Sequence, residues 1–130
     1  MRQVLAILGA AVVIALVAAG FAGALSGSVP APPADPQPAE QVESGAVLYS
    51  QQCAVCHGQN AVGGVKDLRY LTTEKHAEFA DIVLGGKLKK QGMESFSDRL
   101  SPQQVQAIHA YLISRGQEDW QPDFMRPRRK

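Results

Sequence analysis

At 130 residues, the chain has room for one domain with extensions. Its formal net charge is only +1, so overall charge gives no indication of binding to nucleic acid. It contains two cysteines, three positions apart, which leaves no further thiol for a disulfide framework or a cysteine-rich zinc site.

The first feature along the chain is an apolar segment from Val4 to Leu25. It carries no charge and follows only Met1-Arg2-Gln3, which is typical of an export signal. Ala22-Gly23-Ala24 fits the small-x-small pattern for cleavage after Ala24, whereas a run of 22 residues is also long enough to cross a bilayer. We favour residues 1–25 as an uncleaved hydrophobic helix that anchors the protein, with Arg2 on the cytoplasmic side.

Residues 26–41 form a proline-rich linker. They read SGSVPAPPADPQPAEQ, with five prolines and few apolar residues. This composition predicts a semi-rigid spacer with a reach of about 50 Å if it is largely polyproline-like. Because a spacer suits a domain held off a membrane, we expect the domain on the periplasmic side of a bacterial inner membrane. If the signal is cleaved, we expect a soluble periplasmic protein instead.

The most informative stretch is Cys53-Ala54-Val55-Cys56-His57, the C-x-x-C-H signature of covalent c-type haem attachment. One short helical turn presents both sulfurs to the two vinyl groups of a porphyrin and aims the His57 imidazole at the iron. A thioredoxin-like motif would follow a β-strand, which is not predicted here. A zinc site would need four ligands, and His76 and His109 fall on separate predicted helices, far apart. We therefore expect one haem c on Cys53 and Cys56, with His57 as an iron ligand.

The domain over residues 42–118 is predicted to contain three helices. Val42–Gln52 places Val42, Ala46 and Tyr49 on one face. Gly45 beside them either marks a close crossing with another helix or merely weakens a short one.

The second helix is expected over Glu74–Leu84, capped by Thr72 or Thr73 and ended by Gly85-Gly86. The third follows Ser101-Pro102-Gln103-Gln104, which combines an N-cap, a first-turn proline and a capping box, and we expect it to end at Gly116. The buried faces are predicted to be Phe79, Ile82 and Val83 on one helix and Val105, Ile108, Tyr111 and Leu112 on the other. His76 is expected to be exposed and His109 partly exposed.

Between these helices lies a loop from Lys87 to Arg99, which we call the Met93 loop. Met93 is either core filling or a second iron ligand, and we favour the ligand because Met/His ligation is a standard cytochrome c arrangement. Lys87, Lys89 and Lys90 either form a solvated edge or surround the exposed haem edge and steer an acidic redox partner.

Three smaller features are open to more than one interpretation. A carbonyl near Lys66 is our candidate partner for the second ring nitrogen of His57. Arg69 either contacts a haem propionate or is a surface cation. The tail over residues 119–130, with four basic residues near its end, is either a flexible solvated segment or an arm that docks on an acidic partner.

With these motifs in place, the chain resembles the class I cytochrome c family. The phrases IVLGG, GMxSFxDxL and AIHAYLISRG, within Gly45–Gly116, resemble in particular the cytochrome c domain of quinohaemoprotein (PQQ-dependent) alcohol dehydrogenases. The resemblance implies an all-α class I cytochrome c fold around covalent haem, thioethers at Cys53 and Cys56, and axial ligation by His57 and Met93. Lys66 and Glu94 stand where the family often has proline.

These features lead us to expect a monohaem electron carrier rather than an enzyme. The resemblance implies a periplasmic quinoprotein dehydrogenase as electron donor and a cytochrome or terminal oxidase of the respiratory chain as acceptor. Two alternatives are a haem sensor or peroxidase-like protein with an open sixth iron position, and a haem subunit that anchors a dehydrogenase to the membrane.

Overall fold

The computed structural model describes residues 29–120, and every regular element within them is helical. The all-α prediction is therefore confirmed for this part of the chain. The predicted hydrophobic helix and nearly all of the basic tail lie outside the described residues. Among residues 29–120, no helix has both the length and the apolar character needed to cross a bilayer.

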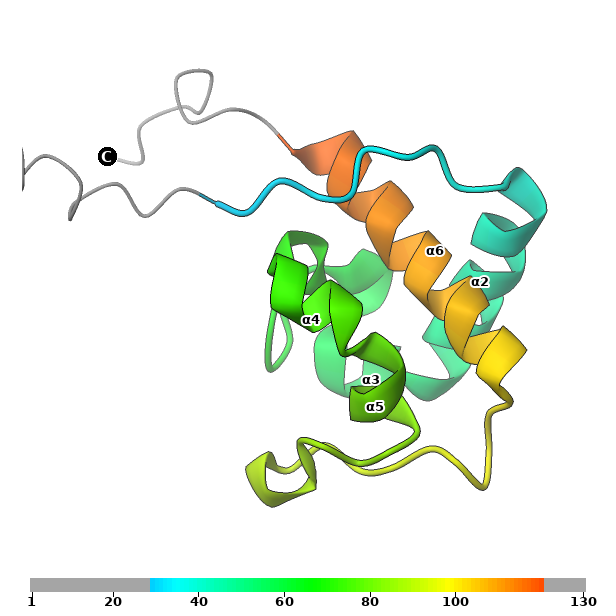
Figure 1. The fold of residues 1–130 in the computed structure, drawn as a ribbon, viewed down its shortest axis with the longest axis vertical. Coiled ribbons are helices and arrows are strands. Elements are labelled where there is room, and N and C mark those ends of the chain that lie inside the picture. Colours follow the sequence, from blue (N-terminus) through cyan, green and yellow to red (C-terminus); the bar gives the residue numbers. More distant parts are fainter. Residues whose placement is uncertain (1–28, 121–130) are drawn as a thin grey trace, which may run out of the picture.

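Two helices that are distant in the chain, α2 (Ala39–Gln52) and α6 (Pro102–Asp119), cross to form the centre of the fold (Figure 1). Gly45 is buried at the crossing, and a Cβ built on it would overlap the carbonyl oxygen of Ala107. Next to it, the rings of Tyr49 and Tyr111 pack with centroids 5.3 Å apart. The close-crossing interpretation of Gly45 is confirmed.

Helix α6 begins as the sequence predicts. The Ser101 hydroxyl accepts from the backbone amide of Gln104, and the Gln104 side chain accepts from the amide of Ser101, which completes the capping box. Its predicted end at Gly116 is wrong, because the helix continues to Asp119. Gly116 is instead a site of close approach, since a Cβ there would lie 2.7 Å from the carbonyl oxygen of Arg69.

The predicted helix over residues 74–84 is divided into α4 (Thr73–Ala77) and α5 (Phe79–Val83). The break is at Glu78, whose ψ of 5° leaves the helical range, and no proline or glycine signals it. Thr72 caps α4 as predicted. The predicted buried face of α5 is confirmed by its buried residues Phe79, Ile82 and Val83.

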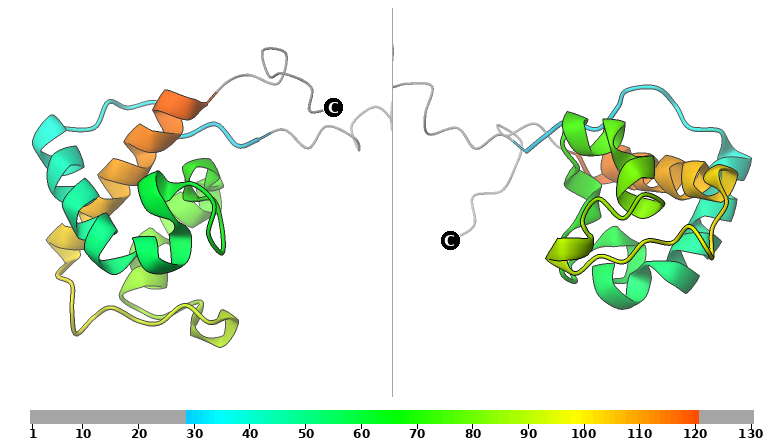
Figure 2. Two further views of the ribbon diagram at one scale, coloured as in Figure 1. Left: turned by 180° about the vertical axis from the view of Figure 1, so that it is seen from behind. Right: turned by 60° about the horizontal axis from the view of Figure 1, so that its bottom comes forward.

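The remaining elements are single turns that come between α2 and α6 in the chain, and they can be followed by colour in Figure 2. They are α3 (Ala54–His57), η1 (Gln59–Ala61), η2 (Leu68–Tyr70) and η3 (Lys89–Gln91). The core combines residues from all parts of the domain, and its least exposed large side chains are Tyr49, Val105, Ile108 and Leu112.

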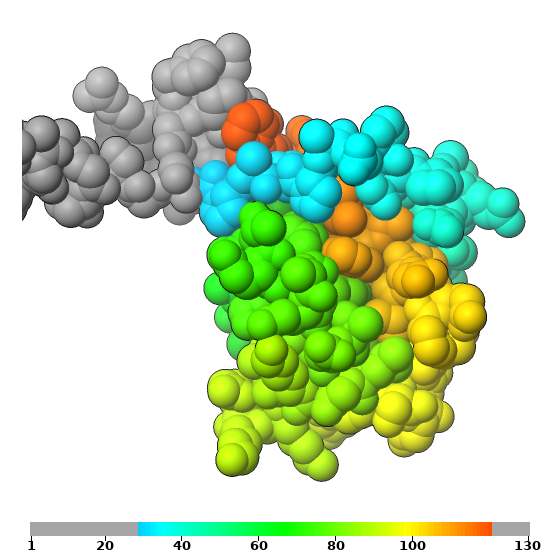
Figure 3. Space-filling model, in the orientation of Figure 1, coloured from blue at the N-terminus to red at the C-terminus, as the bar shows by residue number. Residues whose placement is uncertain are grey.

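The described part of the proline-rich linker does not extend freely from the domain. Residues 29–38 run across the C-terminal end of α6, at the top of the space-filling view (Figure 3). Pro32–Asp35, which we call the strap, contacts Gly116 and Gln117 there. The linker also ends earlier than predicted, because α2 begins at Ala39.

Candidate haem site

The attachment motif forms one tight turn at the end of α2. The carbonyl of Tyr49 accepts from the Cys53 amide at 2.9 Å, which ends α2, and the Cys53 carbonyl then accepts from the amides of Cys56 and His57 at 3.1 and 3.0 Å. Local hydrogen bonds thus define the turn that carries both thiols and the imidazole.

The two cysteines are free thiols in different environments, with Cys53 half-buried and Cys56 exposed. Burial, together with the nearby Cys56 sulfur, raises the pKa of Cys53 to about 11. Redox-active C-x-x-C motifs instead lower the pKa of one thiol to obtain a reactive thiolate. The environment of Cys53 therefore does not support a thioredoxin-like site.

The His57 ring is held by the loop that follows the motif. Its Nδ1 lies 3.4 Å from the carbonyl oxygen of Lys66, so the predicted carbonyl is confirmed although Lys66 replaces the family's frequent proline. A histidine whose Nδ1 donates to a carbonyl presents Nε2 to a metal. The loop itself lies directly on the turn, since the Val65 amide donates to the Cys56 carbonyl at 2.8 Å. A Cβ on Gly64 would overlap the backbone of Cys56.

A second contact to this loop comes from Tyr49, which was predicted only as a core residue. Its hydroxyl donates to the carbonyl of Gly58 at 2.9 Å while the side chain is 1% exposed. Burial raises the pKa of this phenol above its ordinary value, so Tyr49 stays protonated and able to donate.

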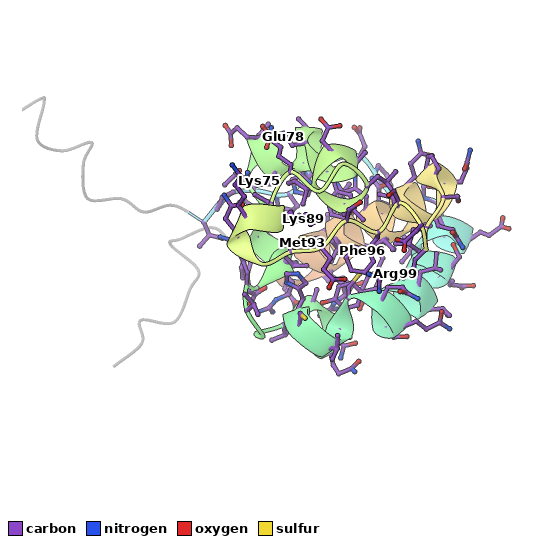
Figure 4. All side chains as sticks on the ribbon, turned by 90° about the horizontal axis from the view of Figure 1, so that it is seen from below. Lys75, Glu78, Lys89, Met93, Phe96 and Arg99 are labelled. Atoms are coloured by element: carbon purple, nitrogen blue, oxygen red, sulfur yellow. The ribbon has the colours of Figure 1, made fainter. Side chains whose placement is uncertain are left out.

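The Met93 loop is attached to the end of α5. The Phe96 amide donates to the Val83 carbonyl at 2.8 Å, and the Ser95 hydroxyl donates to the Leu84 carbonyl at 2.5 Å. Gly92, with a φ of +95°, turns the chain just before Met93. Viewed from below, Met93 and Phe96 lie near the middle of this face (Figure 4).

The apolar side chains around the motif suit a porphyrin. Several are only partly buried although they pack against the core. They come from α2, the motif itself, η2, the residue after α5 and the Met93 loop: Leu48, Cys53, Leu68, Leu84, Met93 and Phe96. Within residues 29–120, no group of three or more His, Cys, Asp or Glu side chains could hold a metal ion. An imidazole and a thioether are donors that suit an iron already held by a porphyrin.

Arg69 is half-buried and has two carboxylate partners. Its guanidinium contacts Asp67 at 2.6 Å and Asp119 at 3.1 Å, and its side chain is 18% exposed. Hydrogen bonding to Arg69 holds the pKa of Asp67 below its usual value. The surface-cation interpretation is therefore wrong, while contact with a propionate stays a prediction.

His76 and His109 lie together, contrary to the sequence-based expectation. His76 Nδ1 is 2.8 Å from His109 Nε2, and the ring of Phe79 stacks on His109 with centroids 4.4 Å apart. His76 is half-buried rather than exposed, and its Nε2 is buried without a hydrogen-bond partner. The two histidines are 33 residues apart and have no local sequence signal, because only tertiary packing against α6 brings their rings together.

An all-helical fold in which one turn carries two thiols and an oriented imidazole defines a c-type cytochrome domain. Comparison with known proteins agrees. A family model described as "Cytochrome C oxidase, cbb3-type, subunit III" matches residues 40–112, more than half of the chain. The chain belongs to the cytochrome c family, whose members bind haem c covalently and carry electrons.

The relatives include large enzymes and a small cytochrome. The chain is 46% identical over 91 residues to quinohemoprotein alcohol dehydrogenase ADH-IIG of Pseudomonas putida, covering 68% of this chain but 12% of the enzyme. A solved structure of that enzyme matches with a TM-score of 0.65 and 45% identity, over 72% of this chain and 14% of the other. Cytochrome c6 of Anabaena variabilis is 28% identical over 81 residues, or 59% of this chain and 94% of the relative. The chain therefore spans only a small part of the enzymes it matches.

Proposed function

We propose that this haem-based electron carrier attaches its cofactor through Cys53 and Cys56 and uses His57 and Met93 as axial iron ligands. The observation that carries the proposal is the turn at Cys53–His57, with the His57 Nδ1 directed at the Lys66 carbonyl. This contact leaves Nε2 for the iron.

Met93 is the only methionine within residues 29–120, and its loop is attached to α5 at two adjacent residues, Ser95 and Phe96. The thioether is partly buried against the core, as expected for a side chain facing a bound group. Glu94 stands where a proline is common in the family. Its carboxylate forms an ion pair with Arg99 at 2.8 Å, so an ion pair rather than a proline ring restrains this part of the Met93 loop.

Held by His57 and Met93, a haem would supply one-electron chemistry between the ferrous and ferric states at a raised potential. The protein's contribution is to hold both ligands on packed segments, so that neither moves when one electron arrives or leaves. The surrounding apolar side chains limit the access of water. This arrangement suits electron transfer more than catalysis at the iron.

We propose a periplasmic quinoprotein dehydrogenase as the electron donor and a cytochrome or terminal oxidase of the respiratory chain as the acceptor. Support for the donor comes from the relatives, since quinohemoprotein alcohol dehydrogenases carry a similar domain within one long chain. Support for a periplasmic, membrane-anchored location comes from the uncharged run Val4–Leu25. An anchoring role for a dehydrogenase is compatible with electron transfer and predicts co-purification in detergent.

The first test is the optical spectrum of the reduced protein with and without carbon monoxide. We expect no change in wild type and a clear change in Met93→Ala, because removal of the thioether opens the sixth position. Leu88→Ala, at a half-buried residue of the same loop, is the matched control and is expected to resemble wild type. If wild type binds the gas readily, the iron is open and the protein is a ligand-binding or peroxidase-like haem protein.

The attachment residues are tested separately by the mass of the denatured chain. One haem should remain on wild type and none on the double variant Cys53→Ala/Cys56→Ala.

The proposed electron donor is tested by mixing the oxidised cytochrome with a purified PQQ-dependent alcohol dehydrogenase and its alcohol. Rapid reduction supports the proposed donor, and reduction no faster than with the alcohol alone contradicts it.

A further inference from the structure

We propose that the strap (Pro32–Asp35) is a permanently docked part of the cytochrome domain, and that it fixes the point where the preceding chain joins the domain at the end opposite the Met93 loop. The inference rests on the proposed function, because it concerns which face of the electron carrier remains open to partners. It differs from the sequence-based expectation of a linker that extends freely between anchor and domain.

The strap is held by one side-chain amide of α6. Gln117 Nε2 donates to the carbonyl of Pro33 at 2.6 Å and to the carbonyl of Asp35 at 3.0 Å. Both hydrogens of the NH₂ group are therefore used by a segment more than 80 residues away in the chain. A linker that extends freely from the domain would not hold two of its carbonyls against the same side-chain amide.

Gly116 makes room for the strap. It lies inside α6, where glycine costs about 1 kcal/mol relative to alanine. A Cβ at this position would lie 2.7 Å from the Arg69 carbonyl oxygen and 3.2 Å from Pro32 Cβ. The close approach of η2 on one side and of Pro32 on the other explains why a glycine occupies a helix interior.

The composition of the strap suits this mode of binding. Prolines restrict the unbound segment to extended conformations, so docking costs little conformational entropy. Extended, proline-rich backbone also makes no internal hydrogen bonds, which leaves its carbonyls free to accept from Gln117. Beside the strap, the ion pair between Arg69 and Asp119 joins η2 to the end of α6, so the docking surface is itself fixed.

The docked strap gives the domain two distinct ends. The strap and the C-terminal end of α6 lie together at the top of the molecule, and the Met93 loop lies at the bottom (Figures 1 and 3). Whatever is joined to the chain before Pro32 is therefore attached opposite the Met93 loop. A protein that approaches from the aqueous side can reach the face with Met93. A protein that lies beside the point where the preceding chain joins the strap cannot.

The test uses the full-length, haem-loaded protein in detergent micelles and measures the backbone amides of Ala34 and Asp35 by NMR. In the diamagnetic ferrous state, we expect order parameters of about 0.85, as for rigid backbone. Between the ferrous and ferric states, these amides should show pseudocontact shifts that match one fixed position relative to the iron.

Gln117→Glu is the decisive variant, because it keeps the size of the side chain but replaces the donor with an acceptor. We expect the order parameters of Ala34 and Asp35 to fall below about 0.6 and their pseudocontact shifts to shrink by averaging. Glu118→Gln, at the exposed neighbouring residue, is the control and should leave both unchanged. Values below about 0.6 in wild type, or no change in Gln117→Glu, would overturn the proposal.

The haem spectrum and reduction potential distinguish this outcome from failure of the proposed function. Gln117→Glu should leave both unchanged, because the variant lies at the end of the domain opposite Met93. A mobile strap with a normal Met/His spectrum would refute the docking of the strap and the orientation that follows from it, and would leave the proposed function intact. Carbon monoxide binding by wild type would refute the electron-carrier assignment and leave the docking of the strap intact.

Discussion

The hydroxyl of Tyr49 donates a 2.9 Å hydrogen bond to the carbonyl of Gly58, the residue directly after the attachment motif. This bond joins a buried residue in the last turn of α2 to the far side of the turn that carries Cys53 and His57. The orientation of the motif thus depends on the helix core as well as on the local turn.

Tyr49→Phe should therefore destabilise the haem-loaded protein by about 1 to 2 kcal/mol, because the Gly58 carbonyl loses its donor in a partly buried place. Guanidinium unfolding followed by circular dichroism gives the difference in free energy. Ser50→Ala is the control, since Ser50 is exposed and bonds only to the nearby Val47 carbonyl, and it should change stability by less than about 0.5 kcal/mol. Equal effects of the two substitutions would contradict this role of Tyr49.

Gly45→Ala should be among the most damaging single-methyl changes in the domain. The added Cβ would overlap the Ala107 carbonyl, and a backbone atom of α6 cannot move aside without separating the helices. We expect a loss of about 3 kcal/mol or more, or failure to accumulate as a haem-loaded protein. Thermal unfolding of purified holoprotein measures the effect. Ser44→Ala, on the exposed side of the same helix, should melt within a few degrees of wild type.

The His76–His109 pair should make stability fall in mild acid. Burial, and then the neighbouring His76, lowers the pKa of His109 to about 4, and burial also lowers that of His76. An unfolded histidine titrates near pH 6.5, so the unfolded chain binds these protons first as the pH falls. The stability due to the neutral pair is therefore complete above about pH 6.5 and is lost toward pH 4.

We expect a loss of about 1 to 2 kcal/mol from this pair between about pH 7 and about pH 4, less than the full shift implies because the His109 ring is partly open to water. Urea unfolding at a series of pH values measures it. His109→Gln should flatten the acid side of the curve relative to wild type. Curves that stay parallel would show that the pair contributes nothing to the pH dependence.

Lys89 and Lys90 should steer an acidic redox partner more than Lys87 does. Lys87 Nζ is 2.7 Å from a Glu78 carboxylate oxygen, whereas Lys89 and Lys90 form no ion pair among residues 29–120. Lys89→Glu/Lys90→Glu should lower the association rate with an acidic donor by about tenfold or more at low salt. Stopped-flow reduction at increasing ionic strength measures this, and the Arg/Arg variant should retain the wild-type rate.

The helices could be predicted from the sequence because their signals are local. The capping box at Ser101 and the apolar spacing of Val105, Ile108 and Leu112 are both found in the structure. Gly45 could be named as a possible crossing point because a glycine within a helix costs stability unless its missing side chain allows a close approach. Cys53–His57 is a motif with fixed spacing and needs no tertiary information.

What could not be predicted depends on contacts between distant segments. Gly116 has the usual pattern of a helix end, but the Arg69 carbonyl and Pro32 pack against it and α6 continues. His76 lies among charged residues, which suggested exposure, yet α6 covers one side of its ring. The strap had the composition of a free linker, and only its contacts with Gly116 and Gln117 show where it lies.

The crossing of α2 and α6 also sets an order of events during synthesis. The attachment motif ends at His57, and 62 further residues must be made before α6 is complete at Asp119. At ordinary synthesis rates this interval is about 3 to 12 s. Throughout it, Gly45 and Tyr49 lack the surface on which they pack. The two cysteines are therefore made on an unfinished domain, before the last helix is available to pack against α2.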